Sequence, residues 1–224
     1  MRRFRERVFP ILAVGLYLWF LILDLTRWGD STWVKFAAIC LCLLASLTGL
    51  GTADGRLVAL ALCFTVGADW FLLVLDSRYE AGVTLFLVVQ LLYAYRLYRH
   101  RGGWISRYAL FRLAGLAALI VSALSGRDIF PALSLFYFSN LAANACESAL
   151  PFVTSRPSDV LNHPLRNRFS LGLCLFVACD LCVGGWNLGI LPSFTRVGMW
   201  LFYLPSQVLI VLSQQMKGDP YETF

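Results

Sequence analysis

Residues 62–95 have the sequence LCFTVGADWFLLVLDSRYEAGVTLFLVVQLLYAY. This stretch consists of two long apolar runs joined by the short polar turn Asp76-Ser77-Arg78. A helix that crosses a membrane needs about 20 mostly apolar residues, because each residue adds ~1.5 Å and the hydrocarbon layer is about 30 Å thick. Extended to residues 56–75 and 79–98, both runs reach that length. The stretch therefore predicts two membrane-spanning helices connected by a tight turn.

The rest of the chain has the same character. Of its 224 residues, 59% are apolar and only 14% are charged, against about 25% charged in soluble domains. No linker or low-complexity run divides the sequence, so we expect a single domain over residues 1–224. The predicted fold is an all-α, polytopic transmembrane bundle of about eight spanning helices, at residues 8–23, 33–50, 56–75, 79–98, 108–124, 129–152, 169–190 and 194–214.

The distribution of Lys and Arg predicts that both termini face the cytoplasm, because cytoplasmic loops carry an excess of positive charge. With the N-terminus inside, the outer side holds only Arg27, Arg78, Arg127 and Arg196, and Lys35 lies within a helix. The inner side holds Arg2, Arg3, Arg5, Arg7, Arg56, Arg96, Arg99, Arg101, Arg107, Arg112, Arg156, Arg166, Arg168 and Lys217. This asymmetry accounts for the net charge of +6 without nucleic acid as a partner, since basic loops beside a bilayer meet anionic membrane lipids.

The cysteines predict neither a disulfide framework nor a metal site. Cys179 and Cys182 form a CxxC motif, but no second pair accompanies it, and the two histidines, His100 and His163, lie in predicted loops. We therefore expect no metal and no cofactor. All seven cysteines fall inside predicted spans, where a thiol behaves as a small apolar side chain: Cys40, Cys42, Cys63, Cys146, Cys174, Cys179 and Cys182.

Two aspartates at membrane depth are the candidate catalytic residues. An ionisable group is costly inside a bilayer unless it faces a partner, the bundle interior or a water-filled cavity. Counted from Arg56 and Arg168 at the inner boundary, Asp69 and Asp180 both lie about 18 to 20 Å up an outward-running helix, at ~1.5 Å per residue. We expect the two carboxyl groups to share one layer of the bundle and to face each other.

Further polar side chains reach a similar depth and predict a buried polar cavity. Their spacing of three or four residues places neighbours on one helix face, although Asn, Gln and Tyr also join helices by hydrogen bonds alone. Lys35, near a helix end, either extends to the interface or pairs with a carboxylate. The candidate binding or supporting residues are Lys35, Gln90, Tyr93, Asn140, Asn144, Tyr203 and Gln207, with Glu147 as a further intramembrane acid.

The two halves of the chain show a faint internal similarity. Asp69 and Asp180 each precede a helix with a central glutamine, Gln90 or Gln207. Four helices per half would give two repeats of parallel orientation. The pattern allows a 4+4 internal repeat, with both aspartates in a shared interior.

Four segments resemble the lysoplasmalogenase or YhhN-like family of membrane proteins. STWVKFAAICLCLL at 31–44 is similar to the second family helix, with its embedded Lys35. Residues 62–95 resemble the family's Gly-Asp helix and the helix after it, through Asp69, Gly82, Phe86 and Tyr93. LGLCLFVACDL at 171–181 is similar through Phe176 and Asp180, and FYLPSQVLIVLS at 202–213 through Tyr203 and Gln207.

Three positions depart from the family pattern. Ala68 stands where the family has the glycine before its first aspartate, and Cys179 stands where it has a serine before the second. Gln90 replaces a family histidine, which removes a proton carrier or a contact to the lipid headgroup. These differences bear on substrate and activity more than on fold.

The resemblance implies hydrolysis of the vinyl ether bond of a single-chain ether phospholipid, a lysoplasmalogen, to a fatty aldehyde and glycerophospho-ethanolamine or glycerophospho-choline. Such chemistry needs a carboxylic acid to protonate the alkene and a second carboxyl nearby, as in glycoside cleavage. Asp69 and Asp180 are the candidates for that pair. Tyr93, Tyr203 and Gln207 would orient water or the carboxyls, and Lys35 would contact an aspartate or the phosphate.

A second function class also fits these residues. Paired acids at mid-membrane, in a bundle with internal symmetry, are typical of proton-coupled small-solute transporters. In such a carrier Asp69 and Asp180 would relay protons rather than cleave a bond. The sequence lacks Ser-His-Asp and P-loop patterns, so it supports neither a serine esterase nor an ATP-driven pump.

Overall fold

The computed structural model describes residues 3–26, 28–99, 108–154 and 163–217. Several residues used above lie outside these ranges: Arg2, Arg27, His100, Arg101, Arg107 and Arg156. The described part contains eight α-helices and no strand. They are α1 (Phe9–Thr26), α2 (Thr32–Ser46), α3 (Ala53–Asp69), α4 (Tyr79–Arg99), α5 (Ala109–Leu124), α6 (Phe130–Thr154), α8 (Pro164–Asn187) and α9 (Pro192–Leu212).

The helices agree with the predicted spans in number and order, and differ at some ends. A π-helical segment, η3 (Trp70–Val74), follows α3 directly, so the α-helical geometry ends at Asp69 rather than at residue 75. The helix α8 begins five residues before the predicted start of its span, at Pro164, because proline suits the first turn of a helix. Short segments of π-helix, η1 (Phe4–Val8), and of 3₁₀-helix, η2 (Leu47–Gly49), adjoin α1 and α2.

Six of these helices are long and apolar enough to cross a membrane. The helix α5 is apolar but has only 16 residues. The helix α6 has 25 residues, and its polar side chains keep it out of this set. The chain is therefore a multi-pass membrane protein, in which α5 falls outside this set by its length and α6 by its polar side chains.

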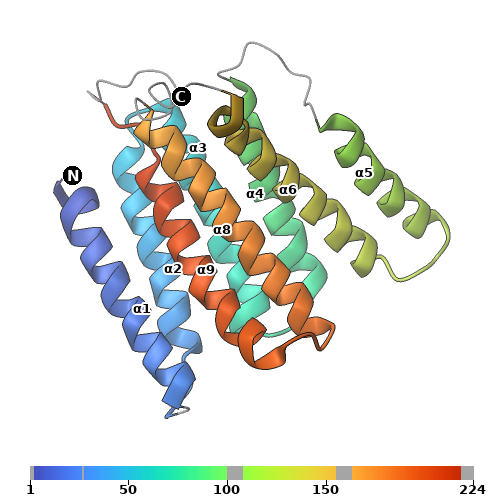
Figure 1. Cartoon of the computed structure of the whole chain (residues 1–224), viewed down its shortest axis with the longest axis horizontal. Helices are drawn as coiled ribbons and strands as arrows, with labels where there is room; N and C mark the ends of the chain where they lie inside the picture. The colour runs from blue at the N-terminus through green and yellow to red at the C-terminus, as the bar shows by residue number, and fades with distance from the viewer. Residues whose placement is uncertain (1–2, 27, 100–107, 155–162, 218–224) are drawn as a thin grey trace.

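The helices form one bundle, with α1 and α5 at its two edges (Figure 1). The hairpin of α8 and α9 packs closely together, α4 lies against both α3 and α6, and α6 also packs against α5 and α8. On the other side, α2 contacts α1, α3 and α9. The start of α1 and the end of α9 lie at the same end of the bundle, as an even number of crossings requires (Figure 1).

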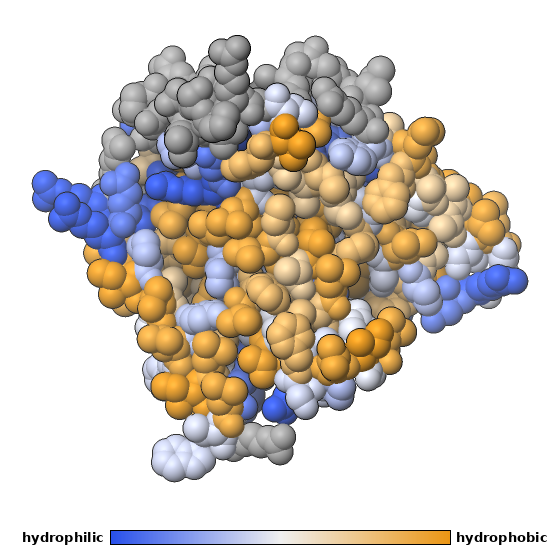
Figure 2. All heavy atoms as spheres, viewed as in Figure 1, coloured by the Kyte–Doolittle hydropathy of each residue, from blue (hydrophilic) through white to orange (hydrophobic). Residues whose placement is uncertain are grey.

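The surface of the bundle is apolar and its interior is partly polar. Figure 2 shows hydrophobic residues over most of the visible face, and large apolar side chains such as Ile11, Leu110 and Leu171 are exposed. In contrast, Gln90, Arg96 and Glu147 are fully buried. This distribution is opposite to that of a soluble protein and suits a hydrocarbon surrounding.

The turn between α2 and α3 depends on a close approach of two glycines. Thr52 caps α3, and its hydroxyl oxygen accepts a hydrogen bond of 2.9 Å from the Gly55 amide. This geometry brings Gly55 against the backbone of Gly49, so that a Cβ added at Gly55 would lie 1.8 Å from the Gly49 carbonyl oxygen. The contact is with backbone, which cannot rotate away as a side chain can.

We predict that Gly55→Ala destabilises the protein, because the new methyl group must displace the turn that holds α2 and α3 together. The expected loss is about 1–3 kcal/mol of unfolding free energy, the usual cost of overpacking. The midpoint of thermal unfolding in detergent measures it. The matched control is Gly15→Ala in α1, where a Cβ meets no atom within 4 Å; equal midpoints for the two variants would contradict the prediction.

Candidate functional site

Asp69 lies in the bundle interior, at the point where α3 changes from α-helical to π-helical geometry. The side chain is buried, and its Oδ2 atom accepts a hydrogen bond of 2.7 Å from the Tyr203 hydroxyl of α9. This bond joins α3 to α9 across the bundle. A π-helical turn widens the helix locally and is frequent at functional sites.

Asp180 approaches the same region from α8. Its Oδ2 atom is buried and makes no hydrogen bond within the described part of the chain. The hydroxyl of Tyr137, on α6, lies beside this carboxyl without a hydrogen bond of standard geometry. Buried polar atoms are nearly always hydrogen-bonded in proteins, so these two groups are candidates for binding water or a ligand.

The two aspartates belong to one cluster. Tyr137 and Cys179 interact electrostatically with both carboxyl groups, and Tyr203 interacts with Asp69, Cys179 and Tyr137. We therefore name Asp69, Asp180, Tyr137 and Tyr203 the acid–tyrosine cluster. The sequence predicted two carboxyls that face each other; in the structure each carboxyl has its own tyrosine as its immediate polar neighbour.

Aromatic rings surround this cluster. The Phe86 ring lies 6.0 Å from Tyr137, 5.6 Å from Phe176 and 6.3 Å from Tyr203, measured between ring centroids. Phe176 also contacts Tyr203, at 5.6 Å. The two carboxyls therefore lie among apolar surfaces, where electrostatic interactions are stronger than in water.

No cation neutralises these two acids among the residues that the structure describes. The other buried acids differ: Asp54 pairs with Arg96 at 2.6 Å, and Glu147 accepts a hydrogen bond of 2.6 Å from Tyr98 with Arg112 at 4.0 Å. A carboxyl group inside a membrane is costly unless a counter-ion or a function accounts for it, so these two aspartates are candidates for a functional role.

Gln207 and Tyr93 contribute further unsatisfied groups. Gln207, one turn beyond Tyr203 on α9, is fully buried, and both of its amide heteroatoms lack a hydrogen-bond partner in the described chain. The hydroxyl of Tyr93 on α4 is buried and unpartnered in the same sense. Both residues were predicted to support the site, and both carry atoms suited to holding water.

The other predicted polar residues belong to a different network, centred on Arg112 of α5. The Arg112 guanidinium donates to Asn140 Oδ1 at 2.7 Å and to Asn144 Oδ1 at 2.8 Å, both on α6. Asn144 in turn donates to the backbone carbonyl of Gln90 on α4, at 2.8 Å. The polar groups of Asn140 and Asn144, predicted to share a cavity with the aspartates, join α4, α5 and α6 instead, and Gln90 contributes its two oxygens while its amide nitrogen has no partner in the described chain.

Lys35 pairs with a carboxylate, one of the two alternatives that the sequence left open. Its Nζ atom lies 2.7 Å from Asp24 Oδ2, which ties the start of α2 to the end of α1. The same Nζ atom lies 5.0 Å from the centroid of the Trp200 ring on α9. The pair therefore sits beside the helix that carries Tyr203.

Several charged residues of the interior were missed from the sequence, among them Asp24, Asp54, Arg96 and Arg112. Asp24 falls one residue beyond the predicted span 8–23. The apolar residues Leu21, Ile22 and Leu23 come directly before it. Arg96 and Arg112 were counted as inner-loop charges, although both lie within predicted spans. A charged residue inside an apolar run predicts a buried partner, and this signal was present for both arginines.

Comparison with known proteins gives one result. A model of the YhhN family matches residues 30–214, which includes α2 to α9 and all of the acid–tyrosine cluster. Neither a curated protein nor a solved structure matches the chain.

We predict that Arg112→Met loosens α5, because the only buried residue of this helix is Gly115 and Arg112 supplies its polar contacts to α6. Leaving buried acceptors unpaired costs about 1–3 kcal/mol, so amides of residues 109–124 should exchange hydrogen about tenfold faster or more. Hydrogen exchange with mass spectrometry measures this. Arg127→Met, at an exposed turn, is the control; unchanged exchange in both would show that Arg112 is not an anchor.

Proposed function

The chain belongs to the YhhN family, and we propose that it is a membrane-embedded hydrolase that cleaves the vinyl ether bond of lysoplasmalogens. The observation that carries the proposal is the acid–tyrosine cluster: two interior carboxyls that have no cation among the described residues, one bonded to Tyr203 and the other beside the unpartnered Tyr137 hydroxyl. The substrate class follows from the family resemblance of the segments that supply these residues.

The proposed reaction begins with proton transfer to the outer carbon of the vinyl ether. Asp180 is the better placed acid, because its Oδ2 atom has no partner in the described chain and is available to the substrate. Protonation converts the alkene to an oxocarbenium ion, with the positive charge shared between the ether oxygen and the adjacent carbon. The remaining carboxylate stabilises this cation by charge, as in glycosidases.

Water then adds to the cationic carbon and gives up a proton. Asp69, held by Tyr203 at 2.7 Å, is the proposed base for this proton. In the hemiacetal, the Asp180 carboxylate takes the hydroxyl proton while protonated Asp69 donates its proton to the glycerol oxygen. The C–O bond then breaks and releases a fatty aldehyde and a glycerol hydroxyl group. One water is consumed and both carboxyls return to their starting states, so the cycle needs neither metal nor redox cofactor.

Gln207 and Tyr93 are proposed to position the water. Both are buried, and both have unpartnered polar atoms within the described residues. A glutamine with a free carbonyl oxygen and a free amide group can accept from one water and donate to another. This role agrees with the departure at Gln90, whose carbonyl groups are engaged by Asn144.

We predict that Asp69→Asn and Asp180→Asn each lower aldehyde release by about 100-fold or more, since each removes a proton-transfer group. The assay uses purified protein in detergent with a lysoplasmenyl-ethanolamine substrate. Asp76→Asn is the matched control, because Asp76 lies in an exposed turn at a positive φ of 44°, which asparagine tolerates.

Absence of aldehyde release by folded wild-type protein, across pH and headgroups, would remove the hydrolase assignment. Proton-coupled uptake into vesicles that depends on both aspartates would then support the carrier. Activity retained in both asparagine variants would leave the hydrolase possible only with a different catalytic pair.

We also predict that Tyr203→Phe lowers kcat about tenfold and leaves the fold intact. The variant loses the hydrogen bond to Asp69, worth about 1.5 kcal/mol for a charged acceptor, but keeps the ring contacts with Phe86 and Phe176. The control is Tyr17→Phe, which loses a hydroxyl bond to the Leu201 carbonyl elsewhere on α9. Equal kcat values for the two variants would separate Tyr203 from the chemistry.

A further inference from the structure

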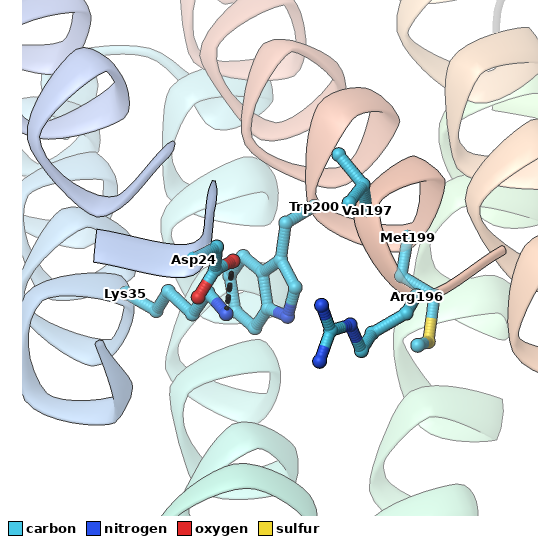
Figure 3. Close-up of a pocket in the computed structure, with 6 residues that line it drawn as sticks. All are labelled: Asp24, Lys35, Arg196, Val197, Met199 and Trp200. Carbon is cyan, nitrogen blue, oxygen red and sulfur yellow. Dashed lines mark ion pairs between the residues drawn. The ribbon is translucent and has the colours of Figure 1, made fainter. Parts of the chain in front are cut away.

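A cavity of about 160 Å³ lies between α1, α2 and α9, at the end of the bundle where α1 stops and α9 starts (Figure 3). It is not part of the acid–tyrosine cluster. Its lining combines charged side chains with apolar ones: Asp24, Lys35, Arg196, Val197, Met199 and Trp200.

The lining has two cations and one carboxylate. The Asp24–Lys35 pair uses one of the three N–H donors of the lysine. Arg196 takes part in no hydrogen bond or ion pair with other described residues, and Figure 3 shows its guanidinium extending toward the Trp200 ring and the ion pair. The cavity therefore has an excess of one positive charge and free donors on both cations.

The depth of these cations suits the headgroup of a lipid. Lys35 and Arg196 each lie about one turn inside their helices, which begin at Thr32 and Pro192. Helix ends in membrane proteins lie near the boundary of the ~30 Å hydrocarbon layer, where phospholipid phosphates are found.

The cavity is connected to the acid–tyrosine cluster by aromatic contacts. Trp200 packs edge-on against Tyr203 with ring centroids 5.3 Å apart, and Tyr203 holds Asp69. Along α9, Arg196 precedes Tyr203 by a rise of about 10 Å at ~1.5 Å per residue. The phosphorus and the vinyl ether carbons of a lysoplasmalogen are separated by a distance on the order of 8 Å at ordinary bond lengths.

We propose that this cavity binds the phosphate of a single-chain phospholipid between Lys35 and Arg196, and thereby places the vinyl ether beside the acid–tyrosine cluster. The inference rests on the proposed hydrolase function for its substrate, but the phosphate site can be tested without catalysis. Arg196 supplies planar, charge-assisted donors to the phosphate. Lys35, fixed by Asp24, supplies the second positive charge.

The test measures equilibrium binding of a radiolabelled saturated analogue, 1-O-alkyl-glycerophosphoethanolamine, which has no vinyl ether to cleave. Protein in a phosphate-free maltoside detergent is compared with Arg196→Gln. Loss of one charge-assisted interaction should weaken binding about tenfold. The matched control, Arg127→Gln, removes an exposed arginine from the α5–α6 turn and should bind as wild type does.

A second comparison varies the ligand instead of the protein. A 1-O-alkylglycerol of equal chain length, which lacks the phosphate, should bind wild type and Arg196→Gln equally and more weakly than the phospholipid binds wild type. Inorganic phosphate should displace the labelled lipid only at large excess. Displacement by inorganic phosphate at concentrations similar to those of the lipid would instead identify a free-anion site and overturn the lipid assignment.

The outcomes for the phosphate site and for the hydrolase are distinguishable. If Arg196→Gln binds the phospholipid as tightly as wild type does, or if wild type does not prefer it to the alkylglycerol, the phosphate site is wrong even where aldehyde is released. If the binding differences hold but wild type releases no aldehyde, the site stands and the hydrolase fails. With both correct, Arg196→Gln raises KM for the vinyl ether substrate about tenfold and leaves kcat nearly unchanged.

Discussion

Hydrocarbon offers no hydrogen-bond partner, and this constraint organises the whole bundle. Polar side chains turn inward and must satisfy one another there, while Leu, Ile, Phe and Trp cover the outside. At one end of the bundle, Arg96 donates to Asp54 and to the Ser213 carbonyl, joining α4, α3 and the end of α9. At the other end, Asp24 and Lys35 join α1 to α2. These bonds fix helix positions that apolar packing alone leaves less specific, because lipid tails pack as favourably as leucine.

The contrast among the buried acids separates structural carboxyls from candidate functional ones. Asp54 and Asp24 each have a cation within ion-pair distance, and removing one partner of such a pair leaves an uncompensated charge in the interior. Asp69 and Asp180 have tyrosines instead. The Tyr203–Asp69 bond joins α3 to α9, but neither carboxyl has a cation among the described residues, which is the arrangement that the proposed proton transfers require.

Sequence reasoning predicted the helices and their order, which depend on hydropathy, and it placed Asp69 and Asp180 in one region of the bundle from their positions along two helices. It did not recover the partners of Asp24, Arg96 and Arg112. Partner choice depends on rotation about each helix axis, and one residue changes that direction by about 100°. An error of a few residues in a helix boundary therefore changes the height of a residue along the helix axis only a little. It leaves the direction in which the side chain points undetermined. Gln90 and Asn144 show the result: Asn144 accepts from Arg112 and donates to Gln90, and neither is hydrogen-bonded to an aspartate within the described residues.

The position of Arg112 also constrains how the protein is made. The helix α5 is synthesised before α6, yet the groups that satisfy its arginine, Asn140 and Asn144, are on α6. Arg112 lies in the first turn of α5, where an unpaired arginine costs less than the about 2.5–3.5 kcal/mol that insertion scales give at a helix centre, but α5 has only 16 residues with which to offset that cost. The two helices should therefore leave the translocon as one hairpin, with α5 retained until its neighbour has emerged from the ribosome.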